Sequence, residues 1–293
     1  MIYTSNRKKT GKKLSSVACE GEYRMQRITE HVFLGTNMRG CNSGAVVTSA
    51  GVVLVDTPMV PAEAKAWRRE VEQSGEIKYV INNEPHRDHV AGSCWMGGTL
   101  VTSEGTRQGI AQNTREALEA QFQWWAPDAL PLGEDFYYRL PDITFTGNLT
   151  LHMGKHTIHI LDMPGHTPTM TAVYIPEERI VFTADNLVWE MPIMFEATPF
   201  GWLESLEKLE KLDVDKVVPG HGDVCDKARI KVMRDDITYL IDSVKEGIAK
   251  GWGVKEIQER VPFSDRFSLD WGDIRELLNK GVAHLYALET KQR

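Results

Sequence analysis

Four of the nine histidines lie in short polar segments that directly follow strand-like runs, a common setting for metal ligands. His86 and His89 belong to the run Glu84-Pro85-His86-Arg87-Asp88-His89. His166 and His221 each follow a Pro-Gly pair, which makes a tight turn and lets the backbone approach closely. A single such histidine is usually a hydrogen-bonded core or loop residue. Two Pro-Gly-His turns and a His-x-Asp-His run argue against that explanation for the whole set.

Carboxylates accompany these histidines. If residues 84–89 were extended, positions 84, 86 and 88 would face one way, and a tight turn near Asp88 and His89 would bring neighbouring residues to a second ion. Asp185 ends another strand-like run and lies between the two Pro-Gly-His turns, which makes it a candidate bridging ligand. Imidazole and carboxylate donors without cysteine suit zinc, iron or manganese rather than a thiolate zinc finger.

The elements that must position these residues follow an α/β order. A strand over 52–56, a helix over 61–71 and a strand over 78–82 precede the cluster, as in folds whose sites lie at the carboxyl ends of strands. Further strands are predicted at 31–35, 44–48, 143–145, 149–153, 157–161, 171–175, 180–183 and 216–218. Helices are predicted at 103–125, 228–250, 254–260 and 271–288.

Together these segments resemble the metallo-β-lactamase superfamily, whose pattern is a strand ending in Asp, then HxHxDH, a His in a PGHT-like turn, an Asp and a final His. The matching positions are Asp56, the 84–89 run, His166, Asp185 and His221, in the same order, and the resemblance covers roughly residues 27–225. It implies an α/β (α+β) fold, a four-layer αββα sandwich, with a dinuclear metal site at the edge where the two sheets meet.

The resemblance also implies a role for each residue. The first metal would be held by Glu84, His86 and His166, and the second by Asp88, His89 and His221, with Asp185 bridging them. Asp56 would be structural and hold the loop that bears the ligands. Glu84 departs from the family pattern, because it replaces the first histidine of the motif. Either it remains a ligand and adds a negative charge, or it swings away and leaves an effectively mononuclear enzyme.

This ligand set predicts a metal-dependent hydrolase that uses two divalent ions, with zinc favoured and iron or manganese as alternatives. A metal-bound hydroxide would attack an ester, thioester, lactam or related small-molecule substrate, and Asp88 would orient it and transfer its proton. One alternative is a non-haem iron oxidoreductase that uses oxygen, since Glu84, His86 and His166 form a two-histidine, one-carboxylate set. A second alternative is a catalytically silent metal-binding module.

The remaining expectations concern the rest of the chain. Residues 1–22 are expected to form a flexible basic extension, and residues 23–293 a single domain that includes a helical segment from about 226. A net charge of −7 gives no electrostatic case for nucleic acid, and no apolar run is long enough for a membrane helix. Four scattered cysteines suggest reduced thiols in a cytoplasmic protein.

Two segments could form walls of a substrate pocket. Residues 123–132 carry a Trp pair, and residues 189–200 carry Met191, Met194 and Phe195. Such a wall would suit an apolar or aromatic substrate group. The same side chains could instead pack in the core or in a homodimer interface, and the sequence leaves these possibilities open.

Overall fold

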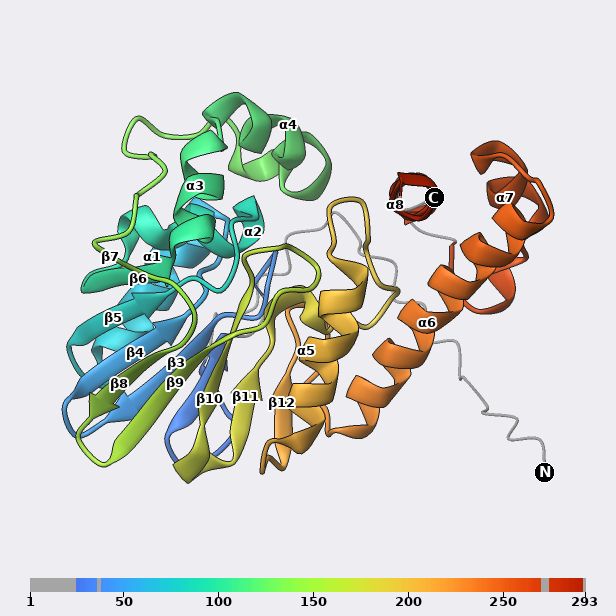
Figure 1. The fold of residues 1–293 in the computed structure, drawn as a ribbon. Helices are drawn as coiled ribbons and strands as arrows, with labels where there is room; N and C mark the ends of the chain where they lie inside the picture. The colour runs from blue at the N-terminus through green and yellow to red at the C-terminus, as the bar shows by residue number, and fades with distance from the viewer. Residues whose placement is uncertain (1–24, 36–37, 270–273, 292–293) are drawn as a thin grey trace.

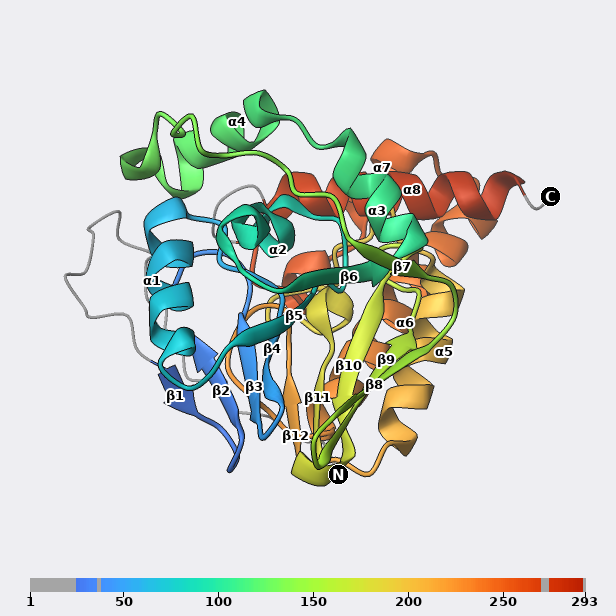
Figure 2. The same ribbon diagram turned by 90° about the vertical axis from the view of Figure 1, so that its left-hand side faces the viewer.

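The computed structural model describes residues 25–35, 38–269 and 274–291, so the predicted extension over 1–22 lies outside the described residues. The described chain forms two β-sheets that pack face to face, with helices on both outer faces (Figures 1 and 2). This arrangement confirms the predicted four-layer αββα sandwich.

The first sheet has seven strands in chain order. Its first four strands form an antiparallel meander, and the last three continue the sheet parallel to the fourth. The strands are β1 (Met25–Arg27), β2 (Val32–Gly35), β3 (Gly44–Thr48), β4 (Gly51–Val55), β5 (Ile77–Ile81), β6 (Thr99–Ser103) and β7 (Ile143–Phe145). Because β4 and β5 are parallel neighbours, the residues that follow them meet at one edge of the sandwich.

The second sheet has five strands, in the order β12-β11-β10-β9-β8. Four of them are antiparallel, and β12 joins parallel to β11. The strands are β8 (Leu149–Met153), β9 (His156–Asp162), β10 (Thr171–Ile175), β11 (Ile180–Phe182) and β12 (Lys216–Val218). The carboxyl ends of β9, β11 and β12 therefore lie at the same end of this sheet.

Alternating side chains on β4 show how the layers are held together. Val53 and Val55 lie in the hydrophobic cluster between the two sheets, where they join Val173 and Phe182 of the second sheet. Leu54 instead packs on the outer face of the first sheet. This alternation is the period-2 pattern of a strand that is buried on both faces.

On the outer face of the first sheet, α1 (Pro61–Glu72) and α4 (Arg115–Trp125) pack into its hydrophobic cluster. Helix α3 (Glu104–Gln112) follows β6 and contacts the loop between β9 and β10 through Thr106 and Thr169. The prediction of one long helix over 103–125 was wrong. Asn113 and Thr114 adopt extended conformations between α3 and α4, and the Thr114 side chain accepts a hydrogen bond from the Ala117 N–H as the N-cap of α4. At this break the Asn113 side-chain amide donates a hydrogen bond to the Pro85 carbonyl 2.8 Å away, which connects the helix end to the run 84–89.

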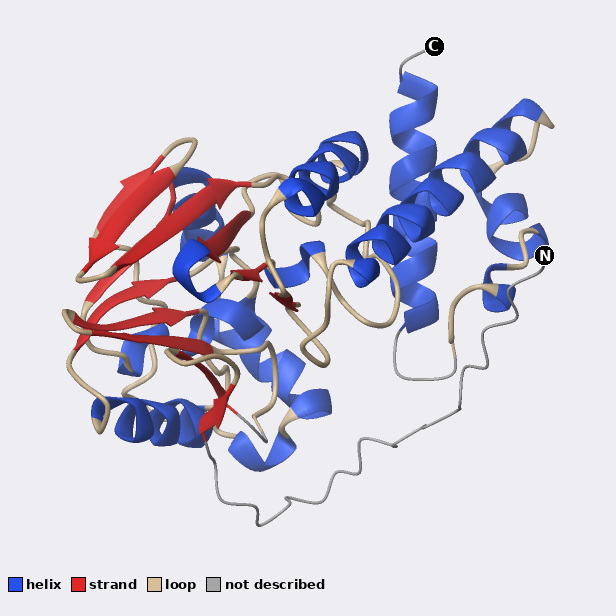
Figure 3. Cartoon of the chain, turned by 90° about the horizontal axis from the view of Figure 1, so that it is seen from below, coloured by secondary structure: helices blue, strands red, loops and turns tan. Residues whose placement is uncertain are grey.

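Helices on the outer face of the second sheet come from the C-terminal part of the chain. They are α5 (Pro199–Lys211), α6 (Ala228–Ala249), α7 (Val254–Arg260) and α8 (Ile274–Lys291). In Figure 3 the strands gather at one side of the molecule and the C-terminal helices at the other. One continuous hydrophobic cluster connects these helices to β10 and β11 of the sheet. Within the described ranges, none of the helices is long and apolar enough to span a membrane.

Candidate metal centre

The seven predicted ligands meet at one edge of the sandwich, although they come from separate parts of the chain. Glu84 and the rest of its run follow β5, and Asp185 lies in the short helix η4 (Ala184–Asn186) after β11. His166 lies in the loop between β9 and β10, and His221 follows β12. The strand order brings these segments together, because the carboxyl ends of the strands that precede them share this edge.

Asp56 holds the loop that carries the first ligands, as expected. It follows β4 with a positive φ of 55°, a conformation that non-glycine residues rarely adopt. Its carboxylate accepts hydrogen bonds from the Asn83 backbone N–H at 2.9 Å and from the Asn83 amide at 3.2 Å. Its Oδ2 also lies 3.2 Å from Nδ1 of His89. Asp56 therefore fixes both the start of the loop and the back of one imidazole.

The ligand run bends where a turn was expected. Residues Arg87–Val90 form a single helical turn, α2, with His86 in extended conformation before it. Glu84 and His86 consequently face one group of ligand atoms, and Asp88 and His89 face another. A straight strand would place position 88 on the same side as positions 84 and 86. The helical turn instead directs Asp88 to the other group.

The first group of ligand atoms, called here the Glu84 group, comprises Glu84, His86, His166 and Asp185, with the donor atoms within 4.8 Å of one another. Glu84 Oε2 lies 2.5 Å from His86 Nδ1, and that nitrogen lies 3.3 Å from His166 Nε2. The Glu84 side chain is fully buried, and its Oε1 accepts a hydrogen bond from the Asp185 backbone N–H at 3.1 Å. Its carboxylate thus points into the group.

The second group, called here the Asp88 group, comprises Asp88, His89 and His221. His221 Nε2 lies 3.1 Å from Asp88 Oδ2. Asp185 lies between the two groups: its Oδ1 is 3.3 Å from His89 Nε2 and 3.4 Å from His221 Nε2, and its Oδ2 is 3.7 Å from His166 Nε2. This is the position that a carboxylate shared by two ions would need.

Each Pro-Gly-His turn is held by an asparagine that the sequence reasoning did not identify. The buried Asn186 accepts from the His166 backbone N–H at 3.0 Å and donates to the Met163 carbonyl at 2.7 Å. Asn42 donates to the carbonyls of Pro219 and Gly222, both at 2.8 Å. Asn186 is 20 residues from His166 in the sequence, and Asn42 is 177 residues from Pro219. No local sequence pattern therefore signals the contact of Asn42 with the His221 turn.

The glycines of these turns are required by close packing. A Cβ at Gly165 would lie 2.0 Å from Asn186 Oδ1, and a Cβ at Gly220 would lie 1.9 Å from Asp185 Oδ1. Neither glycine needs a positive φ, so the reason for each is the approach of the backbone to a buried oxygen. The turns can therefore bring their histidines against Asp185 only without a side chain at these positions.

Two further groups contact the ligands from behind, on the loop that follows η4. His86 Nε2 lies 2.5 Å from Glu196 Oε1, and His166 Nδ1 lies 2.8 Å from the Ile193 carbonyl. In both rings the other nitrogen faces the Glu84 group. Carboxylates and carbonyls in this position fix the tautomer and orientation of a metal-binding imidazole. Glu196 was missed in the sequence because a lone glutamate 110 residues from its partner carries no motif.

Cys41 is a buried neighbour of the Asp88 group and does not face the two ligand groups. It lies with Asp56 on the Nδ1 side of His89, and burial raises the pKa of its thiol. Cys41, Cys94 and Cys225 are all free thiols. A buried thiol of raised pKa is a poor nucleophile, because the thiolate is the reactive form.

The electrostatics of the centre favour positive charge. Burial lowers the pKa of His86, but Glu84 and Glu196 outweigh burial and raise this pKa to about 10. Burial likewise opposes the charge of His221, yet Asp185 and Asp88 raise its pKa. In return, the facing imidazoles hold the pKa values of Asp88 and Asp185 below their usual range in spite of burial. The carboxylates therefore create a negative potential where the donors converge.

The donor set fits divalent transition metals. Four imidazoles and three carboxylates converge without a thiolate, and such nitrogen and oxygen donors suit zinc, iron or manganese. Among the described residues, Nε2 of His89 and Oδ1 of Asp185, which face each other in the centre, are buried atoms without a hydrogen-bond partner. Buried polar atoms are normally satisfied, so a cation between these donors would provide the interaction they lack.

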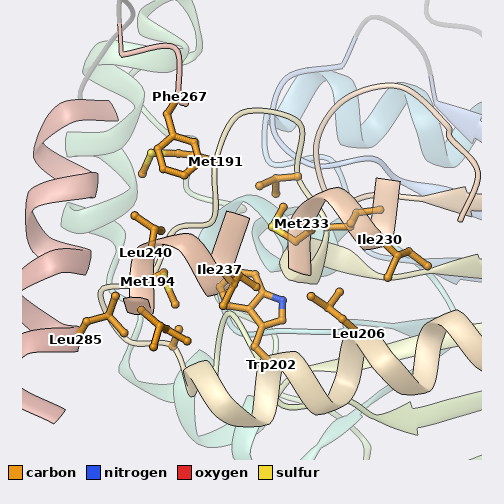
Figure 4. Close-up of a cluster of buried hydrophobic side chains, with 14 of the residues drawn as sticks. Met191, Met194, Trp202, Leu206, Ile230, Met233, Ile237, Leu240, Phe267 and Leu285 are labelled. Carbon is orange, nitrogen blue, oxygen red and sulfur yellow. The ribbon is translucent and has the colours of Figure 1, made fainter. Parts of the chain in front are cut away.

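The segment 189–200 contributes some side chains to the hydrophobic core and others to the surface beside the metal centre. Met191 and Met194 are buried among α5, α6 and α8 (Figure 4), so the interpretation of these residues as core side chains is correct. Phe195 is 37% exposed, and its ring centroid lies 6.4 Å from that of His86. Trp189 is 44% exposed and lies against the backbone of Gly222. The exposed aromatic rings therefore flank His86 on one side and the His221 turn on the other.

Comparison with known proteins agrees with this fold. The family model described as the Metallo-beta-lactamase superfamily matches residues 36–221. The chain belongs to the metallo-beta-lactamase superfamily.

Three curated relatives have different names. The chain is 25% identical over 198 residues to a beta-lactamase-like protein 2 homolog of Caenorhabditis elegans, which covers 67% of this chain and 60% of the relative. It is 26% identical over 206 residues to a linear primary-alkylsulfatase of Pseudomonas sp., with coverage of 66% and 38%. It is 28% identical over 193 residues to a hydroxyacylglutathione hydrolase of Roseobacter denitrificans, with coverage of 64% and 66%. The chain thus spans less than two thirds of the length of these relatives.

Two solved structures share the fold at low identity. A metallo-beta-lactamase from Pontibacter korlensis superposes with a TM-score of 0.58 at 19% identity, over 74% of this chain and 99% of the other. A sec-alkylsulfatase from Pseudomonas sp. superposes with a TM-score of 0.72 at 15% identity, over 91% of this chain and 50% of the other. The second match extends over more of the present chain.

Proposed function

We propose that this protein is a metal-dependent hydrolase with a dinuclear centre. Its ligands are Glu84, His86 and His166 for one ion, Asp88, His89 and His221 for the other, and Asp185 between them. The observation that carries this proposal is the position of Asp185, whose two oxygens face donors of both groups. The full burial of Glu84 among these donors supports its role as a ligand.

The charges of the centre suit this chemistry. Glu84, Asp88 and Asp185 carry three negative charges, whereas two divalent ions carry four positive charges, so the loaded centre favours one additional anion. When bound, zinc would supply a Lewis acid and lower the pKa of water towards about 7. Asp88 lies in its group with a carboxylate oxygen 3.1 Å from His221 Nε2, where it can orient a nucleophile and transfer its proton.

The substrate class is an ester, thioester, lactam or related small molecule with an apolar or aromatic part. The positions of Phe195 and Trp189 support an apolar or aromatic substrate group, because Phe195 is exposed beside His86 and Trp189 is exposed beside the His221 turn. The relatives provide a test panel: a hydroxyacylglutathione thioester, a primary alkyl sulfate and a β-lactam, to which a simple aryl ester is added.

Metal analysis of protein purified without added metal, combined with this panel, tests the proposal. We expect zinc at up to two ions per chain and turnover of at least one compound, with turnover lost after chelation and restored by zinc. A chain that binds no metal, or that turns over none of the panel with zinc, iron or manganese supplied, would contradict it.

A second candidate function is an iron-dependent oxidoreductase that uses oxygen. It is supported by the Glu84 group, in which two histidines and a carboxylate adjoin Asp185, a donor set typical of non-haem iron enzymes. Stoichiometric iron together with oxygen consumption would favour this function over hydrolysis. Zinc together with hydrolytic turnover would exclude it.

We also infer that residues 226–293 belong to the same domain as the sandwich. Ile237 of α6 and Leu285 of α8 lie in one hydrophobic cluster with Met194, and the same cluster includes Val181 of the second sheet. Met194 lies in the loop between η4 and α5, and in the same loop Glu196 contacts His86 and the Ile193 carbonyl contacts His166. The C-terminal helices would therefore support the centre by anchoring this loop.

A further inference from the structure

A second cluster of histidine and glutamate lies at the opposite end of the sandwich. His31 directly precedes β2, His156 begins β9, and Glu178 ends the short helix η3 (Pro176–Glu178) between β10 and β11. β2 and β9 both run towards the edge that carries the metal centre, because β2 has the direction of β4 and β9 leads to the His166 loop. Their first residues therefore lie at the other end, where the cluster connects the first sheet to the second.

The three side chains converge on one oxygen atom. Glu178 Oε1 lies 2.7 Å from His31 Nδ1 and 3.1 Å from His156 Nε2. The two imidazole rings meet edge to face, with centroids 4.7 Å apart. One ligand atom from each residue lies within 4.8 Å of the other two. Two histidine nitrogens and a carboxylate oxygen are thus already gathered at one point.

Burial makes the cluster more than a surface ion pair. The side chains of His156 and Glu178 are each 7% exposed, whereas that of His31 is 39% exposed. Among the described residues, Nδ1 of His156 has no hydrogen-bond partner, so this nitrogen can take up the ring proton when Nε2 binds an ion instead of donating to Glu178. Burial raises the pKa of Glu178, but hydrogen bonds from Thr29, His156 and His31 lower it to about 2, which keeps the carboxylate ionised.

We propose that His31, His156 and Glu178 form a separate binding site for a transition-metal ion such as Zn²⁺. Two imidazoles and a carboxylate are a donor set that zinc accepts, and the exposed side of His31 leaves a fourth position for water. Bonds of about 2.1 Å in a tetrahedral site place ligand atoms about 3.4 Å apart, so the two histidines must retreat from Glu178 by only about 0.3–0.7 Å.

Such an ion would join the two sheets. His31 belongs to the first sheet through β2, and His156 and Glu178 belong to the second. An ion that binds only the folded chain stabilises it in proportion to its concentration over its Kd. The site would therefore be structural and would not depend on the chemistry of the catalytic edge.

Equilibrium dialysis of the full chain against Zn²⁺ tests the site by difference. The variants are His31→Gln and Glu178→Gln, and the control is His152→Gln, an exposed histidine on the neighbouring strand β8. We expect the wild type and His152→Gln to bind one more zinc ion per chain than the other two variants. Because only the difference matters, the result is independent of the number of ions at the catalytic edge.

Equal zinc content in all four proteins would overturn the proposal. The half-exposed position of His31 makes His31→Gln the variant best able to fold, and circular dichroism checks this. Thermal unfolding gives a second readout. Zn²⁺ should raise the Tm of the wild type and of His152→Gln more than that of His31→Gln, whereas an equal rise in all of them would also contradict the site.

Discussion

The Glu84 group and the Asp88 group share Asp185, but different parts of the fold support them. Behind the Asp88 group lies the first sheet: Asp56 contacts His89, and the His89 carbonyl accepts hydrogen bonds from the side chains of Thr57 and Asn82. Behind the Glu84 group lies a loop of the second half, which contributes Glu196 and the Ile193 carbonyl. His89 is fully buried, whereas His86 is 25% exposed.

This difference indicates that the two groups tolerate change differently. The supports of the Asp88 group are buried and also hold the strand ends, so altering them should affect folding as well as metal binding. Glu196 is 46% exposed and contacts the His86 nitrogen that faces away from the Glu84 group, so altering it should affect metal binding alone. The predictions below test this contrast.

The largest effect is expected from Asp88→Asn. The substitution keeps the size of the side chain but removes the negative charge that faces His221. It also removes the carboxylate to which proton transfer is assigned. We expect kcat/KM to fall about 10²–10⁴-fold on any substrate that the enzyme hydrolyses. Asp128→Asn, at an exposed Asp that pairs with Arg39, is the control and should retain activity. A loss of less than tenfold in Asp88→Asn would exclude the assigned role.

Substitution of Glu84 separates the two groups by metal content. Glu84→Ala should lose one metal ion per chain, because it removes a buried ligand of the Glu84 group while leaving the Asp88 group intact. Glu84→His should retain both ions, since imidazole can replace the carboxylate as a donor. Mass spectrometry of metals measures this, and unchanged content in Glu84→Ala would refute the ligand role.

The two supporting carboxylates provide the direct comparison. Glu196→Gln should weaken metal affinity about 10–100-fold with an unchanged Tm. Asp56→Asn should weaken affinity similarly and also lower the free energy of unfolding by about 1–3 kcal/mol, because its NH2 group must face one of the two Asn83 donors that the carboxylate accepts from. Zinc titration and urea unfolding measure the two quantities. Equal stability losses in both variants would remove the proposed contrast.

The smallest effects are expected at the asparagines behind the Pro-Gly-His turns. Asn186→Ala leaves the buried Met163 carbonyl and the His166 N–H without partners, which should cost about 1–3 kcal/mol in urea unfolding. Asn42→Ala should cost less, because water can reach the Gly222 carbonyl that it contacts. A larger stability loss in Asn42→Ala than in Asn186→Ala would show that the His221 turn depends more on its asparagine than burial suggests.

The sequence predicted most of the fold from local patterns. Strand β10 and helix α7 were predicted at their observed residues, because alternation and helix-end signals are local. The long helix over 103–125 was the main error. Its polar composition did not reveal that Asn113 leaves the helix to hold the Pro85 carbonyl, a contact 28 residues away.

For the metal centre, the sequence by itself determined which residues are candidates. His86, Asp88 and His89 lie within four consecutive residues, and His166 and His221 each follow a Pro-Gly pair, so patterns local in the sequence identify them. Only the tertiary structure decided their surroundings. It paired Glu196 with His86, Asn42 with the His221 turn, and Glu84 with an N–H 101 residues away. Such partners are selected by the packing of two sheets, and a local sequence pattern carries no information about which distant segments that packing brings together.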